Sequence, residues 1–229
     1  MKRLAIAFLV AAFALGTLGA QVARAQAYLL IDYVGFDYED PNPDPGDFGE
    51  NGSGYVGLGE VPGLFAPLTP DFANNEYTYY IHGLMQTNRQ TFGAFIVIDY
   101  TPGRLDVFED SKTLGTPHDF GTNPPSALAP GTFTDGTLFI SGALTNFRFV
   151  FNTVNQTGSY EADFEADAGS QLGNIPATDR KGWTFAGATG NSTQIPEGYY
   201  HQIDGQVFLN NTPVRAQRTS WGGVKGLYR

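Results

Sequence analysis

Hydrophobic and polar residues alternate along much of this chain in the two-residue rhythm of β-strands. The clearest example is Phe147, Phe149 and Phe151, which are separated by polar or smaller residues. Successive side chains of a strand point to opposite faces of the sheet, so this segment predicts a strand with one buried face. Runs 199–203 and 206–209 flank the dipeptide Asp204-Gly205, which predicts a β-hairpin. Other strand-like runs lie at 28–38, 76–83, 91–100 and 104–109.

These runs predict an all-β protein, because the mature chain has no ten-residue stretch with the 3.6-residue period of an amphipathic helix. Roughly nine to eleven strands, joined mostly by short turns, favour antiparallel pairing in a β-sandwich or jelly roll. An outer-membrane barrel is disfavoured, because the strands lack a uniform apolar-out, polar-in rhythm. Two long loops, 39–53 and 111–132, interrupt the strands, and no internal repeat or domain linker is visible.

The N-terminus has the organisation of a bacterial-type secretory signal peptide. Two basic residues precede an apolar run too short to span a membrane, and Ala23-Arg24-Ala25 forms a small-x-small cleavage site. We therefore expect cleavage after Ala25, with cleavage after Ala27 as the alternative. The signal peptide is then 1–25, and 26–229 is a single all-β domain that is secreted or periplasmic. The mature chain has no second long apolar run, which predicts no transmembrane helix.

The charge of the chain excludes one class of partner. The sequence has 13 basic and 23 acidic residues, and the signal peptide contains three of the basic ones. The mature chain therefore carries about −13 and is repelled by nucleic acid and by anionic lipid. It has no cysteines, so its stability must come from burial or bound ions. Segment 215–229 holds four of the remaining basic residues and is a candidate final strand, tail or partner-binding segment.

Four carboxylates alternate along one segment, at Glu161, Asp163, Glu165 and Asp167. On a strand they share one face, while the alanines and the phenylalanine between them share the other. Like charges at about 7 Å spacing repel one another, so solvent, a cation or basic neighbours must offset them. The segment predicts either a solvated acidic face or a cation site.

The same segment contains Glu-x-Asp-x-Glu and resembles the catalytic strand of jelly-roll glycoside hydrolases of the laminarinase and lichenase type. The resemblance covers seven residues. It implies Glu161 as the nucleophile, Asp163 as its electrostatic partner and Glu165 as the general acid/base of a retaining enzyme. A second resemblance concerns Ser220 to Arg229, which are similar to the tails of uncharacterised secreted bacterial β-proteins and imply no activity.

The loop after the first predicted strand is a candidate calcium site. Asp40, Asn42 and Asp44 place oxygen ligands at alternate positions, and Asp47 and Glu50 follow. Ca²⁺ takes about six to eight hard oxygen ligands, and alternate positions are the spacing of calcium-binding loops. A flexible acidic surface loop is the alternative. Calcium is the cofactor that the sequence suggests.

The sequence as a whole favours an exported, non-catalytic β-protein that binds an extracellular ligand or has a structural role. Its 12 Tyr and 18 Phe, its long loops and its acidic surface suit a binding module. They do not separate a polysaccharide ligand from a protein ligand, and they leave self-association open. The alternative is a secreted glycoside hydrolase that uses Glu161 and Glu165.

Overall fold

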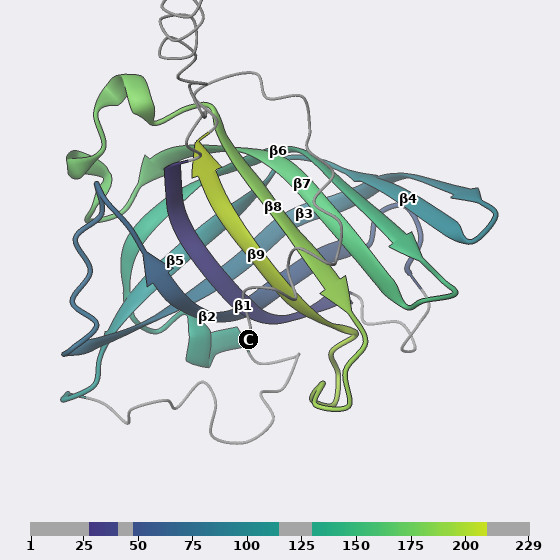
Figure 1. Ribbon diagram of the computed structural model, residues 1–229, viewed down its shortest axis with the longest axis horizontal. Coiled ribbons are helices and arrows are strands. Elements are labelled where there is room, and N and C mark those ends of the chain that lie inside the picture. The colour runs from purple at the N-terminus through teal and green to yellow at the C-terminus, as the bar shows by residue number, and fades with distance from the viewer. Residues whose placement is uncertain (1–27, 41–47, 115–129, 210–229) are drawn as a thin grey trace, which may run out of the picture. The chain divides into compact units, whose positions relative to one another are not determined.

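The computed structural model describes residues 28–40, 48–114 and 130–209, which form nine β-strands and three short 3-10 helices (Figure 1). The short helices are η2 (Pro130–Phe133), η3 (Leu172–Asn174) and η4 (Ala177–Asp179). The strands are β1 (Tyr28–Asp40), β2 (Gly54–Leu64), β3 (Asn75–Phe92), β4 (Phe95–Tyr100), β5 (Gly103–Ser111), β6 (Thr137–Asn152), β7 (Thr157–Ala168), β8 (Trp183–Gly190) and β9 (His201–Leu209).

The strands form one antiparallel sheet that closes on itself. Eight of them follow one another in the order β1-β2-β3-β5-β6-β7-β8-β9, and β9 pairs with β1 to complete the ring. The remaining strand, β4, pairs with one half of β3 and one half of β6. β3 has 18 residues and β6 has 16, so each also pairs with β5 through its other half. Together with β4 they extend beyond the ring (Figure 1).

This architecture confirms the predicted all-β, antiparallel class and corrects its finer form. We predicted a β-sandwich or jelly roll, whereas the described strands close into a barrel with one additional strand. Sandwiches and barrels both bury alternate residues of each strand, so the hydrophobic pattern does not separate them. They differ in which strands pair, here the first described strand with the last.

Aromatic side chains fill the inside of the barrel. The fully buried residues include Tyr33 on β1, Tyr79 on β3 and Phe185 on β8. The rings of Tyr33 and Phe185 stack, with centroids 5.3 Å apart and planes inclined by 7°. In β9, every second residue from His201 to Val207 is buried and the residues between them are exposed. This alternation places the core inside the barrel and polar side chains on its outer surface.

Glycines inside the barrel make room for the tyrosine rings. A Cβ on Gly205 would lie 2.3 Å from the Tyr33 hydroxyl, and a Cβ on Gly187 would lie 2.3 Å from the Tyr160 hydroxyl. The predicted hairpin at Asp204-Gly205 is therefore wrong. Strand β9 runs through this dipeptide because β1 and β8 pair with it on its two sides, and Gly205 provides space rather than a turn.

The run 91–100, predicted as one strand, is a hairpin. β3 ends at Phe92, residues 93 and 94 form a tight turn, and β4 begins at Phe95. Gly93 has a φ of +62°, a conformation that glycine adopts without steric cost. Phe92 and Phe95 are paired directly across the two strands, so both lie at the tip of the hairpin.

A second, smaller hydrophobic cluster lies on the outer surface. Tyr38 and Leu58 belong to it, and they pack with Phe133 of η2 and with Tyr199. The Thr78 hydroxyl of β3 donates a hydrogen bond of 2.8 Å to the Phe133 carbonyl oxygen. This contact fixes η2 against the outer surface of the barrel.

The described residues form one compact unit. The predicted signal peptide, 1–25, and the basic segment 215–229 lie outside the described residues. In the part of the chain that the structure describes, no helix is long and apolar enough to cross a membrane.

Candidate functional site

Residues 48–53 form a strap that packs over the inward faces of the strands at one end of the barrel. Two backbone hydrogen bonds of 2.8 Å join the strap to Gln86 of β3. The Arg89 guanidinium donates a hydrogen bond to the carbonyl oxygen of Phe48. The Phe48 ring is buried and belongs to the main hydrophobic core. The strap is therefore held both by polar contacts and by burial of an aromatic ring.

Below the strap, Asp37 is a buried carboxylate with three hydrogen-bond donors. The His201 backbone N–H and its Nδ1 lie 2.9 Å and 3.0 Å from Asp37 Oδ1. The Tyr55 hydroxyl donates to Oδ2 at 3.2 Å. Buried polar groups are stable only when they are paired, and Asp37, at 2% exposure, meets this condition. It joins β1, β2 and β9 at this end of the barrel.

His201 is enclosed by aromatic rings. Phe48 stacks on its imidazole with centroids 5.6 Å apart, and Phe151 lies at 4.9 Å. Burial alone would lower the pKa of His201, but the adjacent Asp37 carboxylate raises it above its ordinary value. The resulting contribution to stability is present at low pH and is lost as the pH rises through the folded-state pKa.

Glu39 is a second buried carboxyl, two residues along β1 from Asp37. Burial raises its pKa from 4.5 to about 7, against the effect of the Gly49 N–H, which donates to Oε2 at 2.5 Å. The Asp37 charge raises this pKa further, while Arg89 and the Tyr100 hydroxyl lower it. Oε1 is buried and has no well-formed hydrogen bond within the described residues. This carboxyl is therefore only partly satisfied by hydrogen bonds, unlike that of Asp37.

The cavity between these groups is small. It measures about 10 Å³, the space that one water molecule needs, and its lining includes Asp37, Glu39, His201, Tyr55 and Phe48. A sugar ring or any comparable substrate is far larger. The contacts around this cavity fix the strap to the barrel.

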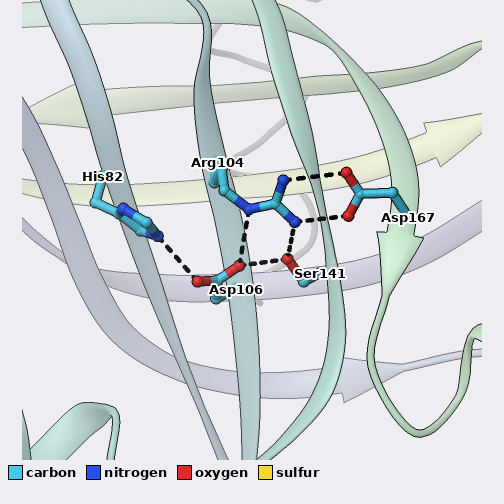
Figure 2. A network of polar contacts seen from close by, with 5 residues as sticks. All are labelled: His82, Arg104, Asp106, Ser141 and Asp167. Atoms are coloured by element: carbon cyan, nitrogen blue, oxygen red, sulfur yellow. Dashed lines mark hydrogen bonds and ion pairs between the residues drawn. The ribbon is translucent and has the colours of Figure 1, made fainter.

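A polar network on the outer surface links four strands (Figure 2). Asp106 of β5 accepts from the Ser141 hydroxyl of β6 and lies 2.9 Å from His82 Nε2 of β3. Arg104 donates to Ser141 at 2.6 Å and to both carboxylate oxygens of Asp167 on β7, at 3.0 Å and 2.6 Å.

This network contains a serine, a histidine and an aspartate, but in the wrong order for a catalytic triad. In a triad the histidine lies between the serine and the acid. Here Asp106 lies between His82 and Ser141, as Figure 2 shows. Desolvation raises the pKa of Asp106, but its hydrogen bonds to His82 and Ser141 outweigh this and lower it. The network therefore cross-links strands, which sequence reasoning had not anticipated.

The acidic segment lies on β7, and its side chains alternate as the sequence predicts. Tyr160, Ala162, Phe164 and Ala166 are buried, while the carboxylates of Glu161, Asp163 and Asp167 are exposed and that of Glu165 is partly exposed. The residues that the resemblance implies as catalytic, Glu161, Asp163 and Glu165, thus share the outer face of the barrel.

Neighbouring polar groups offset three of the four charges of this face. Glu165 forms an ion pair of 2.6 Å with Lys181, and Asp163 accepts a hydrogen bond of 2.6 Å from the Asn146 amide. Asp167 pairs with Arg104. An outer strand face with basic and amide partners has the arrangement of a solvated acidic surface.

The predicted calcium loop is described only at its two ends. Asp40 is exposed at the end of β1, and Glu50 is exposed in the strap, whereas Asn42, Asp44 and Asp47 lie outside the described residues. Within the described ranges, no group of three or more histidine, aspartate or glutamate side chains is arranged to hold a metal ion.

The hairpin of β3 and β4 belongs to a wide face without ionisable side chains. A row of directly paired residues crosses five strands, and paired residues point to the same side of a sheet. This row consists of Phe92, Phe95, Asn152, Thr157 and Gly190. A second row lies next to it and consists of Gln90, Val97, Val150, Ser159 and Ala188. We call these two rows the uncharged face.

The positions of the uncharged face are exposed or half-buried, and the face ends at a charged row. Phe92 and Phe95 are 60% and 47% exposed, unusually high values for phenylalanine. The next row along the strands contains Asp99, Arg148 and Glu161. The sequence carried a sign of this surface that we missed. Segments 90–98, 149–160 and 183–196 contain no Asp, Glu, Lys, Arg or His in a chain of net charge −10.

Comparison with protein-family models, with curated proteins and with solved structures finds no match to this chain.

Proposed function

We propose that this chain is an exported, non-catalytic β-barrel that acts by binding an extracellular partner with its outer surface. The observation that carries the proposal is the uncharged face. Two exposed phenylalanines stand side by side at one end of it, on a hairpin held in the sheet by β6. Aromatic residues that are exposed together on a rigid element are typical anchors of binding surfaces.

The contacts and surroundings of the polar clusters support a non-catalytic role. Three of the four carboxylates on the outer face of β7, those of Asp163, Glu165 and Asp167, have ion-pair or amide partners. The Asp37 carboxylate below the strap is surrounded by donors, beside a cavity with space for one water molecule. Catalytic groups must reach a substrate, and neither arrangement provides an open, concave pocket for one.

The expected result for this proposal concerns retention on cells. Purified protein added to washed cells of the producing organism should bind saturably. Phe92→Ser combined with Phe95→Ser should weaken this binding about tenfold or more, because aromatic anchors dominate the energy of binding surfaces. Phe65→Ser is the matched control, since Phe65 is 43% exposed but lies outside the uncharged face. Equal retention of all three proteins would refute the proposal.

The alternative, a glycoside hydrolase using Glu161, Asp163 and Glu165, has a different signature. Those residues share one outer strand face, so this alternative predicts cleavage of a β-glucan and its loss in Glu161→Gln. The binding proposal predicts no release of sugar and unchanged retention of Glu161→Gln on cells. Sugar release that disappears in Glu161→Gln would establish the alternative.

We further propose that calcium stabilises the fold. The motivation is electrostatic, because Asp40 and Glu50 flank a loop that contains three more candidate ligands. An ion bound only by the folded state adds about 2.7 kcal/mol at a hundred times its Kd. For a domain of this size, that is a rise in Tm of roughly 5–10 °C.

Melting curves in millimolar calcium, magnesium, chelator, and sodium at matched ionic strength test this prediction. Magnesium should stabilise less, because it requires a tight octahedral shell. Sodium would match calcium if the effect were screening alone. Four coincident curves would contradict the prediction. If calcium alone shifts Tm, Asp40→Ala and Asp163→Ala distinguish the loop from the acidic strand.

A further inference from the structure

We propose that the partner of the uncharged face is a neutral polysaccharide chain, lying across β3, β4, β6, β7 and β8. This inference rests on the proposed binding function and adds the chemical class of the partner. Three properties of the face lead to it: its lack of charge, its shape, and the order of side chains along it.

The lack of charge selects against most other ligands. Across two rows and five strands, the uncharged face presents only apolar, amide, hydroxyl and glycine positions. Nucleic acids and acidic polymers need basic partners, and anionic membranes attract basic segments. The chain around this face is strongly acidic. An uncharged extracellular polymer has no ion pairs to lose when it binds to this face.

The shape of the face suits an extended chain. Directly paired residues from Phe92 to Gly190 cross four strand intervals, a span of roughly 19 Å at the ordinary strand spacing. The interval between neighbouring strands is comparable with the length of one pyranose ring. Successive sugar residues can therefore meet successive strands. The rows lie on the outer surface of one hydrogen-bonded sheet, so the platform is preorganised and costs little entropy on binding.

The order of side chains provides both kinds of contact that a sugar chain needs. Phe92 and Phe95, at one end, present exposed rings on which the apolar face of a sugar can stack. Asn152 and Thr157 follow in the same row, and Ser159 lies beside them. The Asn152 amide oxygen accepts from the Val154 and Asn155 N–H groups, which leaves its NH2 group as a donor. The hydroxyl groups of Thr157 and Ser159 are neutral donors and acceptors for sugar hydroxyls. A lipid surface would gain from the rings but not from this polar row.

Co-sedimentation with insoluble polysaccharides tests the inference. The probes are microcrystalline cellulose, an insoluble β-1,3-glucan and granular starch as neutral polymers, calcium pectate as an acidic polymer, and phosphatidylcholine vesicles as a lipid surface. We expect saturable binding to at least one neutral polymer. Raising sodium chloride to about 1 M, where the screening length falls to roughly 3 Å, should leave this binding unchanged, because no ion pair is involved.

Substitutions locate the binding to the face. Phe92→Ser with Phe95→Ser should weaken it about tenfold or more, whereas Phe92→Tyr with Phe95→Tyr should retain it, because the aromatic rings remain. Ser159→Glu tests the polar row independently, since it introduces a charge at an exposed position and should also weaken binding. Phe65→Ser should bind as the unaltered protein does. Circular dichroism of each variant verifies that the barrel is intact.

The other outcomes overturn the inference. Binding to none of the neutral polymers, binding only to pectate or only to vesicles, or unchanged binding of the serine variants would each contradict it. The proposed function is tested separately by retention on cells. Retention that depends on Phe92 and Phe95, without binding to any neutral polymer, would leave the binding function standing and point to a protein partner.

Discussion

Replacing Gly35 by alanine should strongly destabilise the barrel, although the substitution adds a single methyl group. A Cβ on Gly35 would lie 2.1 Å from the Leu58 carbonyl oxygen and 2.6 Å from the Tyr79 hydroxyl. Gly59, its partner on β2, contributes a backbone atom at 2.8 Å. Backbone atoms cannot rotate away, so β1 and β2 must separate. We expect a loss of at least about 3 kcal/mol, or roughly 6–12 °C in Tm.

A graded series of glycine variants tests the steric explanation. The nearest atoms to a Cβ on Gly57 would be isoleucine side-chain atoms, the closest a terminal methyl group at 3.0 Å, and a Cβ on Gly173 would meet nothing within 4 Å. Thermal unfolding should therefore rank Gly35→Ala as the least stable, Gly57→Ala as intermediate and Gly173→Ala as close to the unaltered protein. A Tm for Gly35→Ala within about 2 °C of that of Gly173→Ala would refute the explanation, by the scale of roughly 2–4 °C per kcal/mol.

These glycines also explain why the sequence did not predict a barrel. Alternation of buried and exposed residues was enough to predict strands, and for residues 161–167 of β7 it placed each side chain on the correct face. Closure of the ring depends instead on small residues such as Gly35 and Gly205, which allow strands and tyrosine rings to approach. In a sequence, the same glycines are signals of turns, and Gly205 was misread for that reason.

For the buried polar cluster, the sequence shows that the residues alternate but not which row points inward. Asp37 and Glu39 alternate with Phe36 and Tyr38, so the sequence alone shows two rows on this strand. Hydrophobicity suggests that the aromatic row points inward. The structure places the two acids inside and Tyr38 in the outer cluster. The reason is distant in sequence, because two of the three donors to Asp37 belong to His201, which lies 164 residues away.

The uncharged face is indicated in the sequence by composition rather than by periodicity. Three segments without acidic or basic residues stand out in an acidic chain, yet nothing local indicates that they adjoin. Only the register of β4, β6, β7 and β8 brings Phe95, Asn152, Thr157 and Gly190 into one row. Long-range pairing therefore creates this surface from segments that show no binding motif of their own.

Replacing Glu39 by glutamine should remove much of the pH dependence of stability. The folded-state pKa of about 7 lies above the ordinary value of 4.5. The folded protein thus binds a proton more tightly than the unfolded chain does. The stabilising contribution is complete below about pH 4.5 and is lost as the pH rises through about 7. A pKa difference of this size corresponds to about 3 kcal/mol.

Glutamine is neutral throughout this range, so Glu39→Gln should be more stable than the unaltered protein at pH 8 and should gain little at pH 5. His201 contributes a slope of the same sign, because its pKa is also raised, and that slope should remain in the variant. Urea unfolding at half-unit steps from pH 4 to pH 8.5 measures both effects. Glu60→Gln, at an exposed position of β2, is the matched control and should keep the full slope. If the free energy of unfolding of Glu39→Gln and Glu60→Gln changed with pH in parallel, the pKa of Glu39 would be ordinary. Burial of the Glu39 carboxylate below the strap would then carry no cost.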